Sequence, residues 1–475
     1  MKICVLQPDY SVSKVDYRNY DPPRDLTHLL GGHQVDHIFL NKLTTYGQLK
    51  SLRKKNYDIY INLCEGYLDW DIPSIDVIFS LDLLNLPYTG PTAQLYDPPK
   101  KLMKYVAYTC GIPTPSFRVT RHLDELADIG RDLSFPLFLK PAKAGDSLGV
   151  DEHSLVNDFD ELSEKFSSLI SEFDEVMVEE YIPGREFTVL VVNLPGDSQM
   201  CKAYDPIEFI FPEGYAFKTY ALKTSELHVE ANVPCDDTEL SGKLKDAARK
   251  IFQAFEGKGY ARLDFRVAAD GEIFFLEINF TCSVFYEDGY EGSADYILMN
   301  DEGGKEKFLQ TIISEGIYRH QQKQQNYVVH QNSLEGYGIY AATNIEAGDI
   351  VFQGEERQHR LVTRSHVFQN WNEEAVQTFY RYAWPVSNEV YMLWSSDPSA
   401  WAPQNHSCAP NTVYKGLNLV ASRTISKGEE LTIDYTTFLN EDMESFICNC
   451  GDSNCKKVIQ GKKENAITKF ERDRI

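Results

Sequence analysis

The pattern of apolar and polar positions gives the two parts of this chain different textures. In the first part, short apolar runs at 1–6, 37–40 and 58–63 alternate with helix-like stretches, which predicts a lobe built on parallel strands. A helix is predicted over 101–110, because Gly111 and two prolines follow it. Further strands are predicted at 136–140, 176–180, 186–192 and 273–278. The first part therefore belongs to the α/β class.

The polar segment 320–326, HQQKQQN, lacks apolar periodicity and is interpreted as a linker. After it, short strands separated by glycine turns are expected at 327–329, 338–341, 349–352 and 431–435. The chain is therefore expected to be multi-domain, with an α/β (α+β) module followed by a mostly β one.

Composition narrows the classes of function. The 475 residues suit several domains, and the formal charge of -24 disfavours direct nucleic-acid binding but would attract a basic peptide. Plain solubility is the commoner cause of such a charge. No apolar run approaches the roughly 20 residues of a membrane helix, and MKICVLQPDY is interpreted as a strand, not a signal peptide. A cytoplasmic protein with no membrane partner is expected, and nuclear entry stays open.

The segment FPLFLKPAKAGDSLGV carries the first of three clusters suited to a nucleotide. A strand delivers Lys140, and a loop of small residues containing Ser147 follows it. Small residues let backbone N–H groups approach phosphate oxygens, and the lysine supplies the countercharge. Because glycine loops are common in turns, this cluster alone is a weak signal.

The second cluster is VMVEEYIPGREFTV. Its strand ends at Glu179 and Glu180, before a turn that contains Ile182, and Glu186 opens the next strand. A strand edge with free backbone groups is suited to reading an adenine, and a carboxylate is suited to holding ribose hydroxyls. The alternative is a plain hairpin with exposed acids.

The third cluster, GYARLDFRVAADGEIFFLEINFT, is a predicted hairpin with an Asp-Gly turn. Glu277 and Asn279 are two apart and project on one face of a strand, where Asp264 meets them from its neighbour. Such oxygen ligands suit Mg²⁺, and Arg262, on the same face as Asp264, is placed to offset charge on a phosphoryl group. Burying these groups without a cation would be costly, which favours the functional interpretation.

In this order, the clusters resemble the ATP-grasp fold, and specifically D-alanine–D-alanine ligases, over roughly 1–317; YINLCEGY and LNLPYTGPTA add to the resemblance. The resemblance implies that Lys101, in the predicted helix, and Lys140 contact ATP phosphates and that Glu186 holds the ribose. It also implies that the oxygen donors of the third cluster bind Mg²⁺, and that ATP activates a carboxylate for attack by an amine.

Two departures concern the substrates of such a ligase. The ligases open with a Gly-Gly-x-Ser-x-Glu-type turn, whereas Leu6 is followed here by Gln-Pro-Asp-Tyr. After Asn279 the ligases have a Pro-Gly turn, whereas this chain has Phe-Thr-Cys-Ser. The resemblance therefore supports ATP binding and leaves specificity for D-alanine open.

Cysteine is used unevenly along the chain. Six cysteines are scattered singly, but Cys448, Cys450 and Cys455 form a C-x-C-x4-C pattern that is one thiolate short of tetrahedral zinc. Cys408, in NHSCAPN, would complete a structural four-cysteine Zn²⁺ site. The alternative, a chance cluster of thiols, is disfavoured by this spacing.

NHSCAPN, GEELTIDY and CNCGDSNCKK together resemble SET-domain lysine methyltransferases with a post-SET zinc knuckle, over about 327–461. The resemblance implies that Gly336 and Gly338 lie against S-adenosylmethionine, which Asn405 and His406 also contact. It further implies that Tyr435 lines the channel where a lysine meets the methyl group. The degree of methylation stays open, because Ile433 stands where many members carry Phe or Tyr.

The leading hypothesis is a bifunctional enzyme that acts on an amino-acid or peptide substrate and on a lysine-bearing protein or peptide. The alternatives are a lysine methyltransferase with a non-ligating ATP-binding regulatory domain, and a non-catalytic scaffold that responds to nucleotide. The expected parts are an N-terminal lobe at 1–95, the remaining ATP-grasp lobes at 96–319, the linker at 320–326, the SET domain at 327–440, the zinc knuckle at 441–463 and a tail at 464–475.

Overall fold

The chain forms two compact units, Met1–Gln322 and Lys323–Ile475, which are described separately. The computed structural model describes residues 1–11, 13, 21–66, 71–143, 148–196, 200–219, 231–323, 326–332, 336–352, 360–385, 387–393, 404–415 and 418–462. Helix α9 (Gly304–Lys323) continues into the segment interpreted as a linker, so the first residues of that segment are helical. Within the described residues, none of the helices has the length and apolar character needed to span a membrane.

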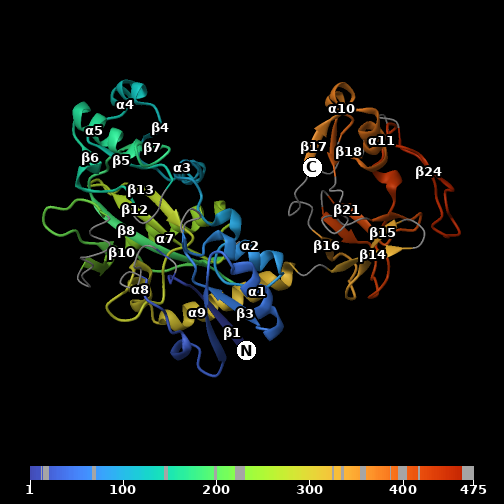
Figure 1. The fold of residues 1–475 in the computed structure, drawn as a ribbon, viewed down its shortest axis with the longest axis horizontal. Helices are drawn as coiled ribbons and strands as arrows, with labels where there is room; N and C mark the ends of the chain where they lie inside the picture. The colour runs from blue at the N-terminus through green and yellow to red at the C-terminus, as the bar shows by residue number, and fades with distance from the viewer. Residues whose placement is uncertain are drawn as a thin grey trace. The chain divides into compact units, whose positions relative to one another are not determined.

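The first unit opens with a small parallel sheet, as the apolar runs predicted, and its strand order is β2-β1-β3. Its strands are β1 (Lys2–Pro8), β2 (Gln34–Leu40) and β3 (Ile59–Asn62), and helices α1 (Thr45–Leu52) and α2 (Ile75–Leu83) follow in the chain. Strands β1 and β3 are labelled in Figure 1. Strand β1 is central, and its residues 3–8 are buried. Helices α1 and α2 pack together in the same hydrophobic cluster as this sheet.

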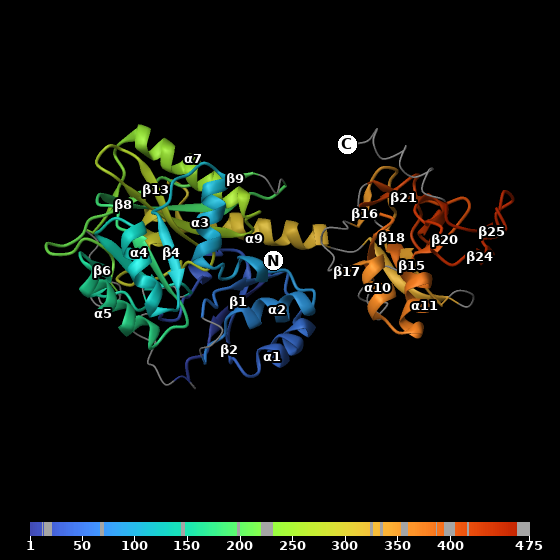
Figure 2. The same cartoon turned by 90° about the horizontal axis from the view of Figure 1, so that it is seen from above.

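A four-stranded antiparallel sheet in the order β4-β7-β5-β6 follows in the chain. Its strands are β4 (Phe117–Thr120), β5 (Leu137–Pro141), β6 (Leu155–Val156) and β7 (Val176–Glu180), and helices α4 (Leu126–Asp132) and α5 (Phe159–Ile170) pack with them. Helix α3 (Lys100–Thr109) precedes this sheet and packs against β13. Figure 2 shows the same elements from above.

The third sheet has six strands in the order β11-β10-β8-β12-β13, with β9 on β8. They are β8 (Arg185–Asn193), β9 (Cys201–Ala203), β10 (Ile207–Phe209), β11 (Asn232–Pro234), β12 (Tyr260–Val267) and β13 (Ile273–Asn279). Helix α7 (Thr238–Ala254) covers one face, and α8 (Ser293–Met299) and α9 follow the sheet in the chain.

Alternation along the two central strands separates an apolar face from a partly polar one. Odd-numbered residues of β8 and β12, such as Phe187 and Leu263, belong to the core beneath α7. Even-numbered residues Glu186, Asp264 and Arg266 are buried on the other face. A polar patch is therefore built into the sheet by period-2 alternation.

The second unit is built from short strands, as predicted. Its strands are β14 (Tyr327–Asn332), β15 (Gly336–Ala341), β16 (Ile350–Phe352), β17 (Arg360–Thr363), β18 (Trp384–Pro385), β19 (Val390–Leu393), β20 (Asn405–His406), β21 (Thr412–Lys415), β22 (Asn418–Ala421), β23 (Thr432–Ile433), β24 (Phe446–Ile447) and β25 (Val458–Ile459). Helices α10 (Arg364–Asn370) and α11 (Glu373–Tyr382) join β17 to β18. Strands β20 and β23, about 25 residues apart in the chain, pair in parallel and bring two of the sequence motifs together.

Candidate functional sites

A pocket of the first unit lies between the polar face of the six-stranded sheet and the strands β5 and β7. Phe138, Tyr181, Ile182, Phe217 and Leu276 give it apolar lining, and charged residues line the rest. Seven residues that were proposed from the sequence contribute to this lining: Lys140, Glu179, Glu180, Glu186, Arg262, Asp264 and Glu277. The combination of an aromatic, apolar wall with paired charges suits a nucleotide.

Lysines converge on carboxylates at one end of this pocket. Lys104 Nζ lies 2.7 Å and Lys140 Nζ lies 2.5 Å from the carboxylate of Glu179. Lys100 Nζ lies 3.8 Å from Glu277 Oε2. The three lysines outnumber the two carboxylates of Glu179 and Glu277, so the cluster carries more positive than negative charge. The lysine side chains are buried, in a place with little water. That arrangement suits phosphate oxygens.

The ionisation of Glu179 follows from these neighbours. Burial alone would raise the pKa of its carboxyl, but Lys104 and Lys140 outweigh burial and lower the pKa to about 2. Burial lowers the pKa of Lys104, which Glu179 partly offsets. Glu179 is therefore held as a carboxylate between the two lysines.

In helix α3 the structure buries different lysines from the one proposed from the sequence. Lys101 is exposed, whereas Lys100 and Lys104, four residues apart on the inner face, are buried. The helix begins at Lys100 directly after Pro98 and Pro99, and its packing against β13 turns Lys100 inward. Sequence reasoning named the adjacent residue because the two lysines are indistinguishable by pattern.

We expect Lys100→Met to weaken ATP binding by about tenfold, the loss that removal of one charge-assisted hydrogen bond produces. Lys101→Met is the matched control, because it removes the same charge one residue away on the exposed side. Titration calorimetry with ATP and Mg²⁺ measures both variants. Equal weakening by the two substitutions, or by Lys101→Met alone, would contradict the assignment of Lys100.

The residues proposed to bind magnesium lie on neighbouring strands and face one another, as the sequence predicted. Asp264 on β12 lies opposite Glu277 on β13, and Arg262 lies opposite Asn279. Arg262 donates from Nε and Nη2 to the two carboxylate oxygens of Asp264, at 3.2 and 3.1 Å. The Asn279 amide donates to Glu277 Oε1 at 3.4 Å. Asn279 is half-buried and stands beside the pocket-lining Glu277.

A β-bulge sets the direction of these side chains. The register shifts between Asp264 and Phe265, so Phe265 pairs with Phe275 and Leu276 is the extra residue. Phe275 therefore belongs to the core beneath α7, while Glu277, two residues on, lines the pocket. The bulge therefore lets Glu277 face the pocket while Phe275 stays in the core.

These donors fit a magnesium ion. Burial opposes the charged form of Asp264, but Arg262 and Lys218 outweigh it and lower its pKa to about 2. Carboxylate and amide oxygens facing one another across two strands are ligands that Mg²⁺ prefers. Thr188 donates its hydroxyl to Asp264 Oδ1 at 2.7 Å and fixes the orientation of the carboxylate.

The ribose-type end contains residues that sequence reasoning missed. Both oxygens of Glu186 face cations: Lys218 Nζ lies 3.4 Å from Oε1 and Arg266 Nη2 lies 3.1 Å from Oε2. Arg266 could have been found by period 2, since it follows Asp264 by two on the same strand. Lys218 stands in an irregular segment, where no periodicity indicates the direction of a side chain.

Glu180 and Ser147 are the remaining nucleotide-type residues proposed from the sequence. Glu180 lines the pocket, but its Oε1 accepts a hydrogen bond from the backbone N–H of Ser134 at 2.8 Å. Its carboxylate is therefore used to hold the adjoining loop. Ser147 lies outside the described residues, and Leu148 and Val150, just after it, line the pocket.

In the second unit, the paired strands β20 and β23 hold the residues proposed to contact S-adenosylmethionine. The Asn405 amide donates to Glu430 Oε1 at 2.8 Å and to the Tyr337 carbonyl at 3.3 Å. A Cβ atom on Gly338 would lie 2.6 Å from Glu430 Oε1 and 3.0 Å from the Asn405 amide. A larger residue there would displace the ends of these two side chains, so glycine favours the close approach of the two segments. Gly336 has a positive φ of 95°, which favours glycine.

Tyr435 follows β23 in a 3-10 turn (η10, Tyr435–Thr437), not in the strand expected over 431–435. Asp434 caps this turn, which ends the strand two residues before Tyr435. The Tyr435 backbone N–H donates to His406 Nδ1 at 3.1 Å, and its hydroxyl donates to the Gln404 carbonyl. Burial lowers the pKa of His406, which favours the neutral ring that accepts this bond.

Aromatic side chains surround Tyr435. Its ring packs against Phe438 and Phe446, with centroids 5.3 and 5.8 Å away. Trp384 stacks on Phe438 at 3.9 Å with an interplanar angle of 8°. A hydroxyl set among aromatic rings is suited to orienting an amine in a place that excludes water.

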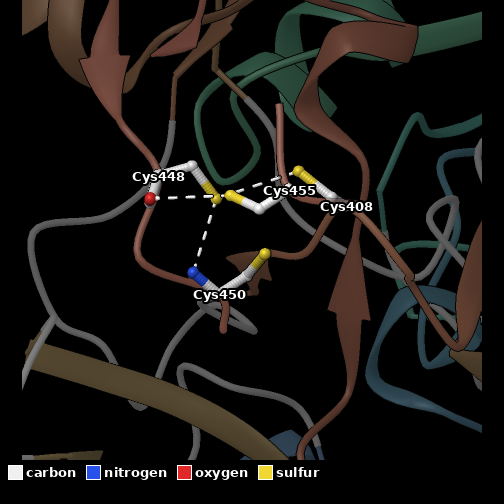
Figure 3. Close-up of side chains that lie close together, drawn as sticks. All are labelled: Cys408, Cys448, Cys450 and Cys455. Atoms are coloured by element: carbon white, nitrogen blue, oxygen red, sulfur yellow. Dashed lines mark hydrogen bonds between the residues drawn. The ribbon is translucent and has the colours of Figure 1, made fainter. Parts of the chain in front are cut away.

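The four cysteines of the C-terminal motifs come together, as Figure 3 shows. Their sulfur atoms lie within 4.8 Å of one another, and those of Cys408 and Cys448 are 3.9 Å apart. A tetrahedral zinc site with Zn–S bonds of about 2.3 Å places its sulfurs about 3.8 Å apart. The geometry of the cluster therefore fits Zn²⁺.

Backbone amides donate to two sulfur atoms of this cluster, and burial raises the pKa of both of those thiols. The N–H of Lys456 donates to Cys408 Sγ at 3.3 Å, and that of Cys450 to Cys448 Sγ at 3.4 Å. Backbone hydrogen bonds lower the pKa of the Cys450 thiol to about 6. At neutral pH at least this thiol favours the charged form that binds metal.

Comparison with known proteins agrees with these two sites. Residues 107–284 match the family model described as D-ala D-ala ligase C-terminus, and residues 336–436 match that of the SET domain. The D-alanine–D-alanine ligase of Aquifex aeolicus (strain VF5) is 31% identical over 201 residues, which cover 42% of this chain and 64% of the relative. That of Psychrobacter sp. (strain PRwf-1) is 30% identical over 230 residues, covering 47% and 65%. The chain thus spans a little under two thirds of these relatives.

Among solved structures, D-alanyl-alanine synthetase A from Vibrio cholerae O1 biovar eltor str. N16961 has a similar fold, with a TM-score of 0.51 at 17% sequence identity. The similarity covers 67% of this chain and 98% of that protein. It extends the likeness from the matched sequence to the arrangement of the first unit.

Proposed function

We propose that this chain, which joins a D-alanine–D-alanine ligase-like ATP-grasp region to a SET domain, is a bifunctional enzyme. The first unit is an ATP-dependent carboxylate–amine ligase for an amino-acid or peptide substrate. The second is an S-adenosylmethionine-dependent methyltransferase for a lysine-bearing protein or peptide. The observation that carries the proposal is that each unit assembles its own set of reactive groups from segments distant in sequence.

In the ligase reaction, a substrate carboxylate oxygen attacks the γ-phosphorus of ATP and ADP leaves. An amine nitrogen then attacks the carbonyl carbon of the acyl phosphate, and phosphate leaves. Lys100, Lys104 and Lys140 hold phosphate oxygens, and Arg262 offsets the charge that develops during transfer. Asp264, Glu277 and Asn279 would hold Mg²⁺, which supplies further neutralisation of phosphate charge when bound.

The two segments that depart from the ligase pattern are linked by a network of hydrogen bonds and ion pairs. Gln7, in the turn that departs from the ligase pattern, accepts from the Arg24 N–H at 2.7 Å and donates to the Arg24 carbonyl at 3.1 Å. The Arg24 guanidinium is buried between Asp21 and Glu65, and Ser283, in the second departure, donates to Glu65. This network joins the two segments that depart from the ligase pattern, and the identity of the substrate within the amino-acid and peptide class stays open.

In the methyl transfer, the neutral lysine nitrogen attacks the methyl carbon and the sulfonium sulfur leaves with the electron pair of the broken bond. Asn405, His406, Gly336 and Gly338 line the segment crossing where S-adenosylmethionine binds. Tyr435 orients the amine, since its hydroxyl is directed to the Gln404 carbonyl and its backbone is fixed by His406. The surrounding rings exclude water from the attack.

Both activities are testable on one preparation of the wild-type chain. We expect Mg²⁺-dependent ADP release that requires an amino-acid or peptide acceptor, and transfer of labelled methyl groups from S-adenosylmethionine to lysines of basic peptides. ATP binding without acceptor-stimulated release would favour the alternative, a methyltransferase with a regulatory ATP-binding domain. Failure to bind S-adenosylmethionine would contradict the second activity.

Zinc is the proposed ligand of the cysteine cluster, and the purified protein is expected to contain about one Zn²⁺ per chain. Cys450→Ser is expected to lower the zinc content and the thermal stability of the second unit, because a structural zinc ion ties the C-terminal segment to it. Cys110→Ser, at a half-buried cysteine of the first unit, is the control. Elemental analysis that finds no zinc in wild type would contradict the site.

We also propose the boundaries 1–95, 96–319, 327–440 and 441–463 for the lobes, the SET domain and the knuckle. The segment 320–326 is proposed as the linker, although helix α9 occupies it as far as Lys323. The proposed tail, 464–475, lies outside the described residues.

A further inference from the structure

Lys456 connects the cysteine cluster to the turn that carries Tyr435. It directly follows Cys455, and its backbone N–H donates to Cys408 Sγ at 3.3 Å. Its ammonium group lies 2.7 Å from Asp434 Oδ2 and donates to Thr436 Oγ1 at 2.9 Å. Lys456 therefore contacts the sulfur of Cys408, a proposed zinc ligand, through its main chain. Through its side chain it contacts both neighbours of Tyr435.

Asp434 and Thr436 define the turn. Asp434 Oδ1 accepts from the Thr436 backbone N–H at 3.0 Å and from its hydroxyl at 2.8 Å. A second connection runs through His406, whose Nδ1 accepts from the Tyr435 N–H and whose Nε2 lies 3.3 Å from Cys408 Sγ. The backbone of Tyr435 is thus held from two sides by groups that also contact Cys408.

The ion pair of Lys456 and Asp434 contributes more to the position of the Tyr435 turn than to the free energy of unfolding. The Lys456 side chain is 44% exposed and that of Asp434 is 18% exposed. Pairs this close to solvent contribute little to the free energy of unfolding, typically up to about 1 kcal/mol. A displacement of about 1 Å in a group that aligns reactants has a far larger effect on rate, up to about a hundredfold.

We propose that Lys456 is a positioning residue, through which metal binding at the cysteine cluster holds the Tyr435 turn in place for methyl transfer. The inference rests on the proposed methyltransferase activity of this unit. Loading of the cluster fixes the main chain at Cys455 and hence the base of the Lys456 side chain. The side chain then fixes Asp434 and Thr436, and with them the hydroxyl of Tyr435.

The test compares Lys456→Met with Lys457→Met and Lys456→Arg in the zinc-loaded full chain. Lys457 is the matched control, because no hydrogen bond or ion pair of its ammonium group occurs within the described part of the chain. Arginine keeps the positive charge and has several N–H donors, so Lys456→Arg should keep part of the methyl-transfer rate. Zinc content, amide hydrogen exchange over 433–437, and kcat and KM for methyl transfer are measured for each.

We expect Lys456→Met to retain zinc, to exchange faster at the Tyr435 and Thr436 amides, and to lose about tenfold in kcat at nearly unchanged KM for S-adenosylmethionine. Lys457→Met should match wild type, and Lys456→Arg should lie between. Removing zinc with a chelator should accelerate exchange at these amides more in wild type than in Lys456→Met, where only the connection through His406 remains.

Unchanged exchange at these amides in zinc-loaded Lys456→Met, or equal effects of Lys456→Met and Lys457→Met, would overturn the inference. Because exchange is measured without substrate, it decides the inference even if wild type transfers no methyl group. That last result would count against the proposed methyltransferase activity alone.

Discussion

Replacing Glu277 by alanine is expected to lower Mg²⁺-dependent ATP turnover by at least about a hundredfold, the size of effect seen when one electrostatic stabiliser of a transition state is removed. Glu277 lies opposite Asp264 across the β12–β13 pair and 3.8 Å from Lys100. Its loss removes a metal-type oxygen ligand and leaves a buried lysine with one fewer counter-charge. Coupled detection of ADP measures the rate.

Methyl transfer should be unchanged in Glu277→Ala, because Glu277 belongs to the other compact unit. Glu272→Ala is a matched control, since it removes an exposed acid directly before the same strand, β13. Wild-type ATP turnover in Glu277→Ala would remove this residue from the metal site.

Replacing Tyr435 by phenylalanine is expected to lower methyl transfer by tenfold to about a hundredfold while S-adenosylmethionine binding is retained. The substitution removes only the hydroxyl that donates to the Gln404 carbonyl. The ring contacts with Phe438 and Phe446 remain, so the local fold should persist. Transfer of a labelled methyl group and calorimetric binding of the cofactor measure the two properties separately.

Tyr382→Phe, at a tyrosine of α11 that is 57% exposed, is the control for loss of a hydroxyl. ATP turnover should be unchanged in both variants. Methyl transfer at the wild-type rate in Tyr435→Phe would show that the hydroxyl does not orient the amine.

The fold class and the two family resemblances predicted from the sequence are confirmed. The strands that carry the site were predictable because their apolar runs are strong: the expected strand at 176–180 is β7, and that at 186–192 lies within β8. The meeting of Asp264 with Glu277 followed from a hairpin with an Asp-Gly turn. Local patterns determine these features, so no tertiary information was needed.

What the sequence left undetermined depends on tertiary packing. The choice between Lys100 and Lys101 depends on how α3 packs on β13, and Lys100 is the buried one. The bulge at Leu276 and the pairing of Glu186 with Lys218 and Arg266 arise between strands and loops. The alternation that places Arg266 on the same face of β12 as Asp264 is visible in the sequence, but the pairings themselves are not.

The measurement that tests the central claim most directly is Mg²⁺-dependent ADP release by the full chain across a panel of D- and L-amino acids and short peptides. The account predicts that one acceptor or acceptor pair stimulates release and that mass spectrometry finds the matching condensed product. Saturable ATP binding with no stimulation by any member of the panel would contradict the ligase assignment and favour a methyltransferase with a nucleotide-responsive domain.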